Sequence, residues 1–254
     1  MKPLVIIAAV PQEVELLEKA LAHSGRVKTG GFERIEGTIG GLRVVVCAGG
    51  VGKANAAAAT AVMIDRYQPQ LVINTGCAGA YIGSGLSIGN LVVASEEILA
   101  DEGVVVAEGW KDLRYMKIPS VEQGGLNCYN VLPLSRHASE QAMRLAEYYG
   151  VILRRGRFAT VSTCSGTRLY GAELFLRWNA LAENMEGAAV AQVCLRCGVD
   201  CLEIRGISNM VDERDMKTWE ITRAVEAAQR FVLKYLEELD RPDIVPIPNV
   251  VPEM

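Results

Sequence analysis

Residues 184–209 are the stretch that most constrains how this chain can fold. An acid, Glu186, precedes a run rich in alanine and valine, and the segment 202–207 follows it. We interpret the run as a helix and the segment as a strand. The segment then ends on Ser208 and Asn209. Polar groups at strand ends are where open α/β sheets bind ligands, so the stretch predicts a strand–helix–strand unit with a binding site at one end.

Strand-like and helix-like segments alternate along the rest of the chain. We expect strands at 4–9, 71–75, 91–94 and 152–160, two or three more within 28–46, and helices at 135–149, 168–178 and 219–239. Residues 104–133 are the least periodic, and we interpret them as an excursion that covers a site or a subunit contact. The alternation predicts one α/β domain over residues 1–240, with a central mixed sheet flanked by helices. Residues 241–254 contain four prolines and are predicted to form an extended tail.

Composition excludes several classes of protein. The chain has 254 residues, half of them apolar, and a net charge of -4 with no basic stripe, which argues against nucleic acid as a partner. No uncharged apolar run reaches about 18 residues, so we expect no membrane span. The N-terminus has no pattern of a signal peptide. Seven cysteines, an odd number, indicate a reduced cytoplasmic protein rather than a disulfide framework. Cys194 and Cys197 form a C-x-x-C pair late in an expected helix, and we interpret them as packed helix cysteines.

Two short segments admit more than one interpretation. Glu13 lies in the first turns of a helix that starts at Pro11, where an acid ordinarily complements the helix dipole. The alternative is a general base at the mouth of the first strand. The glycine-rich turn at 47–53 matches neither a Walker A loop nor a complete G-x-G-x-x-G. Its backbone approaches something closely at a helix N-terminus, which suits a ligand or tight strand–helix packing.

Five segments, in this order and spacing, resemble the nucleoside phosphorylase/nucleosidase superfamily over nearly the whole chain. They are the opening strand with Glu13, the turn at 50–53, and the segments 74–79, 185–189 and 205–209. The resemblance implies a three-layer nucleoside phosphorylase-like fold with a central mixed β-sheet. It also implies a purine nucleoside as ligand, no metal, no organic cofactor, and a homodimer or larger assembly.

The resemblance also implies roles for individual residues in N-ribosyl cleavage. Glu186 would accept hydrogen bonds from the ribose hydroxyls, with the backbone of Met185 beside it. Glu13 would position and deprotonate the water that attacks the sugar. Further substrate contacts are implied for Cys77, Gly79, Gly166, Thr167 and Ser208. Arg205 would support these residues without contacting the substrate.

Asn209 is the residue that bears most on the choice of base. Related methylthioadenosine/adenosylhomocysteine (MTA/SAH) nucleosidases carry aspartate at this place, which can protonate N7 of adenine. An asparagine amide cannot deliver a proton in that way, but it offers a donor to the 6-oxo oxygen or N7 of hypoxanthine. Together with segments 162–167 and 212–215 and with Trp219, this makes the chain most similar to the futalosine hydrolases of the alternative menaquinone route. Their reaction would release hypoxanthine and dehypoxanthine futalosine.

Three other functions stay open at this point. One is an MTA/SAH or aminodeoxyfutalosine nucleosidase of the same fold, and another is a phosphate-dependent purine nucleoside phosphorylase. Hydrolysis is favoured because Glu13 lies where phosphorylases typically place an arginine after the first strand. A third is a non-catalytic nucleoside-binding protein. The benzoate tail of futalosine calls for a cation, for which Lys53, Arg168 and Arg214 are candidates.

Overall fold

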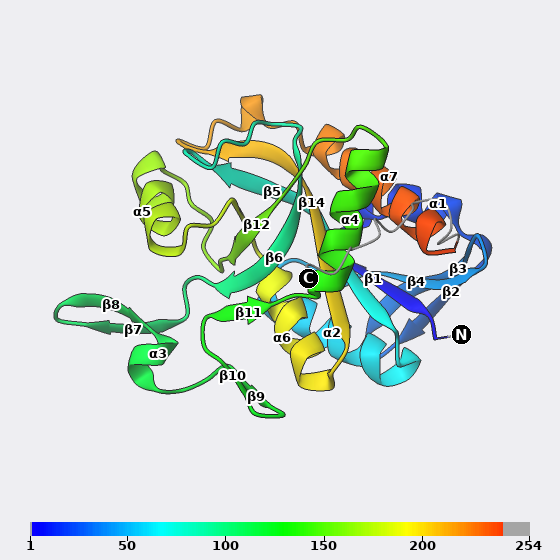
Figure 1. Ribbon diagram of the computed structural model, residues 1–254, viewed down its shortest axis with the longest axis horizontal. Coiled ribbons are helices and arrows are strands. Elements are labelled where there is room, and N and C mark those ends of the chain that lie inside the picture. Colours follow the sequence, from blue (N-terminus) through cyan, green and yellow to red (C-terminus); the bar gives the residue numbers. More distant parts are fainter. Residues whose placement is uncertain (1, 241–254) are drawn as a thin grey trace, which may run out of the picture.

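A ten-stranded mixed sheet forms the centre of the molecule (Figure 1). The computed structural model describes residues 2–240, so the tail expected at 241–254 lies outside the described residues. The strands are β1 (Leu4–Ala8), β2 (Ala22–Thr29), β3 (Phe32–Ile39), β4 (Leu42–Ala48), β5 (Leu71–Tyr81), β6 (Leu91–Leu99), β7 (Gly103–Val106), β8 (Gly109–Asp112), β9 (Val121–Gln123), β10 (Leu126–Cys128), β11 (Val131–Pro133), β12 (Leu153–Thr160), β13 (Ala182–Asn184) and β14 (Asp200–Val211). The α-helices are α1 (Glu15–Ala20), α2 (Lys53–Tyr67), α3 (Leu113–Met116), α4 (Arg136–Tyr148), α5 (Arg168–Trp178), α6 (Gly187–Cys197) and α7 (Ile221–Asp240), and two 3-10 turns are η1 (Pro11–Glu13) and η2 (Met216–Thr218).

The sheet bends back on itself. Its order is β11-β6-β12-β13-β5-β1-β4-β3-β2, and β14 pairs with both β5 and β6. Strands β5, β13, β12, β6 and β14 therefore form a closed ring. Such closure brings side chains from strands far apart in the sequence into one interior.

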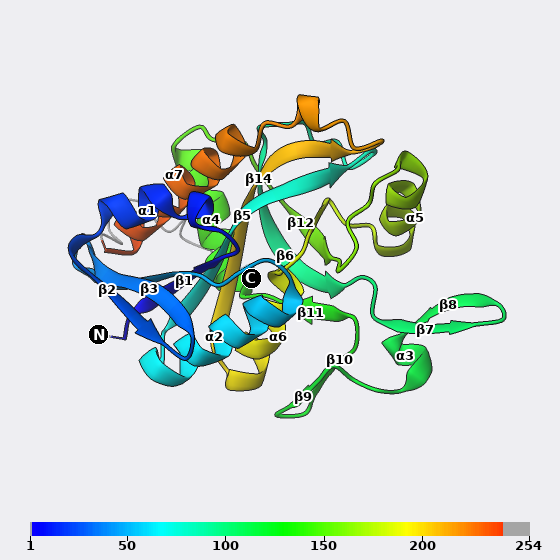
Figure 2. The ribbon, with the colours of Figure 1, turned by 180° about the vertical axis from the view of Figure 1, so that it is seen from behind.

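Helices cover both faces of the sheet, as the alternating pattern predicts. Helices α2 and α6 lie on one side, and α1, α4 and α7 lie on the other (Figures 1 and 2). One core packs Met63 of α2 and Cys194 of α6 against strand residues, and the other packs Leu17 of α1 and Phe231 of α7. The three-layer α/β fold is confirmed.

Several element boundaries differ from the prediction. Strand β14 continues to Val211, and β5 continues to Tyr81, because the two strands pair along their whole length. Their glycine, serine and asparagine residues indicated strand ends, but the pairing overrides that local preference. Strand β2 starts at Ala22, well before the expected strand, because it pairs with β3 while its side chains stay exposed. An exposed strand carries no apolar alternation that could have revealed it.

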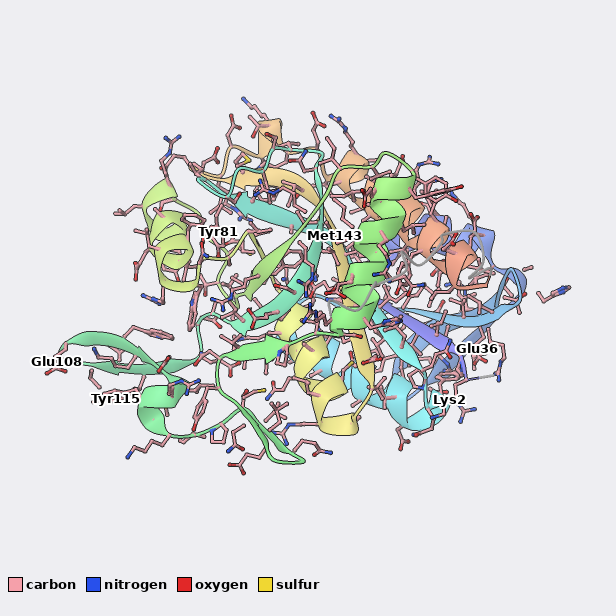
Figure 3. The ribbon with its side chains drawn as sticks, viewed as in Figure 1. Lys2, Glu36, Tyr81, Glu108, Tyr115 and Met143 are labelled. Carbon is pink, nitrogen blue, oxygen red and sulfur yellow. The ribbon has the colours of Figure 1, made fainter. Side chains whose placement is uncertain are left out.

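Residues 104–133 form two short hairpins, β7–β8 and β9–β10, with α3 between them. The β7–β8 hairpin extends away from the body of the molecule in both ribbon views (Figure 2), whereas the base of β9–β10 packs against α6 and β11 pairs with β6 in the central sheet. Glu108, at the tip of β7–β8, and Tyr115 of α3 lie at this outer end (Figure 3). Within residues 2–240, no helix is long and apolar enough to cross a membrane.

Candidate active site

A cavity of about 370 Å³ lies where β1, β5, β13 and β14 present their carboxyl-terminal halves. Its lining includes seven of the nine predicted site residues. These seven are Glu13, Cys77, Gly79, Met185, Glu186, Ser208 and Asn209. They come from four segments that are far apart in the sequence, so the fold assembles the site.

Glu13 is buried at one wall of the cavity. Its Oε2 accepts hydrogen bonds from the backbone N–H groups of Ala9 (3.0 Å) and Val10 (3.2 Å), and its Oε1 accepts from the N–H of Cys77 (3.0 Å). A carboxylate has about four lone-pair positions, so one remains for a ligand or water. Three bonds to the main chain fix the orientation of this carboxylate, which serves as more than a dipole complement.

Gly76 makes room for this carboxylate. A Cβ atom at Gly76 would lie 2.3 Å from Oε1 of Glu13 and 3.2 Å from a terminal nitrogen of Arg205. Any side chain would therefore displace the acid. Cys77 next to it is a poor nucleophile, because burial raises the pKa of its thiol to about 12.

Glu186 lies on another wall, just before α6 begins. Its Oε1 accepts from the backbone N–H of Gly52 (2.9 Å), and its Oε2 lies 3.6 Å from a terminal nitrogen of Arg205. Burial raises the pKa of Glu186, and the positive charge of Arg205 opposes that rise. The carboxylate is thus oriented by one amide and one guanidinium.

The glycine-rich turn at 47–53 has both roles that its sequence left open. Gly52 donates to Glu186 and has a φ of +91°, and Val51 lines the cavity. Gly49 packs tightly, because a Cβ atom there would lie 2.6 Å from the methyl group of Ala59 in α2. The turn therefore supports the site and also packs the helix on its strand.

Ser208 and Asn209 lie inside β14, where the register with β5 shifts between Ile207 and Asn209. Such a bulge redirects side chains. The hydroxyl of Ser208 lies 2.7 Å from Oδ1 of Asn209 and 3.2 Å from the carbonyl of Ala78. The Nδ2 of Asn209 donates to the carbonyl of Met210 (3.1 Å). An amide nitrogen has two hydrogens, so a second N–H remains to donate to a ligand.

Sequence reasoning missed one carboxylate of the lining, Glu183. It accepts hydrogen bonds from the backbone N–H (2.9 Å) and hydroxyl (2.6 Å) of Ser165. Burial raises its pKa, and the bonds from Ser165 oppose the rise. Its place three residues before Glu186 was the available signal, but the short β13 was not expected as a separate strand. Gly166 and Thr167 follow Ser165, yet neither is part of the described lining, and the Thr167 side chain caps α5 through Tyr170.

The three candidate cations have different surroundings. Arg214 lines the cavity, and its guanidinium lies 5.1 Å from the ring centre of Trp219, which also lines it. Lys53 is paired with Asp101 (2.7 Å) and Glu102 (3.0 Å). Arg168 is exposed and is not part of the described lining. Within residues 2–240, no group of three or more His, Cys, Asp or Glu side chains is arranged to hold a metal ion.

Curated proteins similar to this chain include nucleosidases from two Bacillus species. A 5′-methylthioadenosine/S-adenosylhomocysteine nucleosidase from Bacillus cytotoxicus is 29% identical over 237 residues, which cover 92% of this chain and 98% of the relative. A nucleosidase of the same name from Bacillus thuringiensis matches with the same identity and coverage.

Solved structures of the same kind of nucleosidase superpose closely on this fold. The enzyme from Neisseria meningitidis, in complex with methylthio-immucillin-A, has a TM-score of 0.82 and 27% identity, covering 94% of this chain and all of its own. The enzyme from Colwellia psychrerythraea, in complex with adenine, has a TM-score of 0.81 and 27% identity, covering 94% of this chain and 96% of its own. The model of the Phosphorylase superfamily matches residues 3–237. This chain therefore belongs to the phosphorylase superfamily.

Proposed function

We propose that this protein is a nucleosidase that hydrolyses the N-ribosyl bond of a purine nucleoside. The observation that carries the proposal is a pair of buried, oriented carboxylates, Glu13 and Glu186, in one cavity that also contains the amide of Asn209. Each carboxylate is held by backbone N–H groups, so each keeps its geometry without help from a ligand. Preorganised charge of this kind stabilises a transition state most effectively.

The reaction assigns a different task to each of the three groups. Glu186 accepts hydrogen bonds from the ribose hydroxyls and stabilises positive charge as the sugar becomes oxocarbenium-like. Glu13 accepts a proton from water while the water oxygen bonds to C1′. The C1′–N9 bond breaks, and its electron pair leaves with the base. Asn209 donates a hydrogen bond to the departing purine, where negative charge develops.

Charge in the cavity favours water over phosphate as the nucleophile. Glu13, Glu183 and Glu186 line it together with Arg205 and Arg214. Arg205 donates to Glu203 at 2.6 Å and is thereby partly neutralised. Lys53, which could have served phosphate, is paired with two acids. A phosphate dianion would meet three carboxylates here, so we infer hydrolysis.

The similarity to these relatives supports, as candidate substrates of this protein, the two compounds in their name, 5′-methylthioadenosine and S-adenosylhomocysteine. On that basis the first candidate substrate is an adenine nucleoside with a 5′-thio substituent. The high coverage in both directions supports a shared reaction, because the relatives and this chain align along almost their whole length.

Futalosine, or another 6-oxopurine nucleoside, is a second candidate that two residues favour. The spare N–H of Asn209 suits the 6-oxo oxygen or N7 of hypoxanthine, and an amide cannot protonate adenine as an acid would. Arg214 at the cavity, with Trp219 beside it, suits the carboxylate and ring of a benzoate tail. Futalosine has both features, and its cleavage would connect the enzyme to menaquinone synthesis.

Base release distinguishes these candidates. Purified protein is mixed with methylthioadenosine, inosine or futalosine, each with and without phosphate, and the free base is quantified. Adenine release selects the first candidate, and hypoxanthine release from futalosine selects the second. Release that requires phosphate would overturn the proposal of hydrolysis, and tight nucleoside binding without release would make the protein a binder. The Asn209→Asp variant, assayed in parallel, should move preference toward adenine if Asn209 sets base choice.

We also propose that the protein forms a homodimer or larger assembly and acts in the cytoplasm. Large apolar side chains are exposed on α5 and on the β7–β8 hairpin, among them Val105 (78%), Leu169 (83%) and Leu176 (81%). Exposed apolar surface of this kind is typical of protein contacts. All seven cysteines are free, as expected in a reducing compartment. Light scattering of the purified protein tests the assembly.

A further inference from the structure

Two fully buried acids, Glu97 of β6 and Glu203 of β14, lie behind the cavity without lining it. Both crowd the first residue of α6. A Cβ atom at Gly187 would lie 2.1 Å from an oxygen of Glu97 and 2.5 Å from each oxygen of Glu203. The two carboxyl groups therefore meet at one point, directly beneath the start of the helix that follows Glu186.

Glu97 holds the segment around Glu186 through Asn184. Its Oε1 accepts from Nδ2 of Asn184 (2.6 Å), which leaves Oδ1 of that amide facing the helix start. This Oδ1 accepts from the backbone N–H groups of Glu186 (2.9 Å) and Gly187 (2.7 Å). Glu97 also accepts from the hydroxyl of Thr160 (2.7 Å). Through the amide, Glu97 sets where the main chain of Glu186 lies.

Glu203 holds the other partner of Glu186, which is Arg205. Its Oε1 accepts from Nε of Arg205 at 2.6 Å. The terminal nitrogens of the same guanidinium reach the carbonyl of Cys77 (2.9 Å) and lie 3.6 Å from Oε2 of Glu186. The side-chain amide of Asn184, which holds the main chain of Glu186, and the guanidinium of Arg205, which lies beside its carboxylate, thus both depend on this pair of acids.

Charge balance requires a proton in this pair. Two adjacent buried carboxylates repel each other strongly, and Arg205 can neutralise only one of them. Among the residues that the structure describes, no N–H or hydroxyl donates to Oε2 of Glu203. A proton on Glu97 would supply the missing donor. Burial and the neighbouring Glu203 raise the pKa of Glu97 well above the usual range for glutamate, in agreement with a neutral Glu97.

We propose that Glu97 and Glu203 form one proton-sharing pair whose function is to position Glu186. Neutral Glu97 donates its O–H to Glu203 and accepts from Asn184, while ionised Glu203 holds Arg205. The proposal rests on the proposed nucleosidase function, because it assigns both acids as positioning residues for the carboxylate that binds ribose. Neither acid touches the substrate.

The charged and titratable groups that face Glu97 are few. Glu203, Arg205 and the thiol of Cys201 come from β14, and the Cys201 thiol is itself hydrogen-bonded to the free thiol of Cys194 in α6. Tyr81 of β5 also interacts electrostatically with Glu97, and burial raises the pKa of its phenol beyond the ordinary range. The hydrogen bond with Cys194 and burial also raise the pKa of Cys201. Burial thus disfavours the ionised form of each of these phenol and thiol groups.

The test uses two substitutions of Glu97 and one matched control. In Glu97→Gln the amide oxygen can still accept from Nδ2 of Asn184, so the variant keeps the bond that places the main chain of Glu186, but it lacks the proton shared with Glu203 and cannot titrate. Glu97→Val removes the bonds to both residues. Glu96→Gln is the control, because Glu96 directly precedes Glu97 in β6 but pairs with the half-exposed Arg157. The thermal midpoint and kcat/KM for base release are measured between about pH 6 and pH 10.

The wild type should lose stability as pH rises, because the folded state holds a proton that the unfolded chain releases near its ordinary pKa of about 4.3. The difference in midpoint between Glu97→Gln and the wild type should therefore grow with pH, and the control should show no such growth. At neutral pH, Glu97→Gln should keep kcat/KM within about twofold, whereas Glu97→Val should lose about 100-fold through misplacement of Glu186.

A midpoint difference that does not change with pH would overturn the shared proton. An inactive Glu97→Gln that folds as the wild type does would overturn the positioning role. The midpoint measurement needs no substrate. If the wild type released no base from any nucleoside, the proposed function would fail, while the thermal data would still decide whether the pair holds a proton.

Discussion

Replacing Glu13 by glutamine should damage both stability and turnover, and the structure allows both effects to be sized. The carboxylate accepts three backbone N–H bonds, from Ala9, Val10 and Cys77. An amide can keep its oxygen toward Ala9 and Val10, but its NH2 group then opposes the N–H of Cys77. One buried donor is left unsatisfied and the bonds lose their charge, at a cost of about 2 kcal/mol. For a chain of this size that is a fall in midpoint of roughly 4–8 °C.

Turnover should fall more steeply, because glutamine cannot take a proton from water. Loss of a general base costs about 100- to 10,000-fold in rate. The assay is single-turnover base release from the best substrate, with nucleoside affinity measured separately by calorimetry. Glu15→Gln is the control, since this nearby acid is exposed and pairs with Lys19 on the same helix. It should change stability by less than about 0.5 kcal/mol.

Two results would refute this reasoning about Glu13. A Glu13→Gln variant that retains more than about a tenth of wild-type turnover would show that another group activates the water. An unchanged midpoint would show that the three main-chain bonds do not constrain the acid as described. A protein that only binds nucleosides would lose stability as predicted but would have no turnover to lose in either form.

Three further predictions concern other parts of the site. Gly76→Ala should reduce kcat/KM about 100-fold, because its methyl group displaces Glu13 and crowds Arg205, and steady-state kinetics will show it. When kcat/KM is plotted against pH, the pKa of its acid limb should exceed the ordinary glutamate value of about 4.3. Burial raises the pKa of Glu186, and only its ionised form accepts hydrogen bonds from both ribose hydroxyls. If Arg214 binds the benzoate, Arg214→Met should raise KM for futalosine about tenfold and leave KM for inosine unchanged. The control, Arg168→Met, should change neither KM.

The layered fold could be predicted from the sequence because apolar periodicity reports which segments are buried. The helix–strand unit after Glu186 appears as α6 and β14, and Ser135 caps α4 as expected. The path of β14 beyond Ile207 could not be predicted, since its serine and asparagine favour turns. Only the pairing with β5 keeps them in a strand.

The candidate site was predictable where a motif lies within a few residues, and less so where contacts are long-range. The bond from Cys77 to Glu13 joins residues 64 positions apart, and nothing local to either residue signals it. The same holds for Glu97, whose neighbour Glu96 looks identical in sequence but faces Arg157. Strand register decides which of two adjacent acids is buried, and register is a property of the whole sheet.

Overall similarity to the relatives bears on the type of reaction, whereas the side-chain amide of Asn209 bears on which base is released. In the proposed reaction Glu13 and Glu186 act on water and ribose, which every N-ribosyl hydrolysis shares, so 29% identity over 237 residues bears on that shared chemistry. The choice of base depends on one pattern of hydrogen bonds. The hydroxyl of Ser208 donates to Oδ1 of Asn209 and Nδ2 donates one N–H to Met210, so under the proposed function the second N–H of Nδ2 is the one offered to the purine. Opposing that donor to the wrong group would cost about 1–3 kcal/mol, a factor of roughly 5 to 150 between bases. One substitution can therefore change the substrate while the fold and its similarity scores stay the same, and base release should take precedence over likeness in naming the nucleoside.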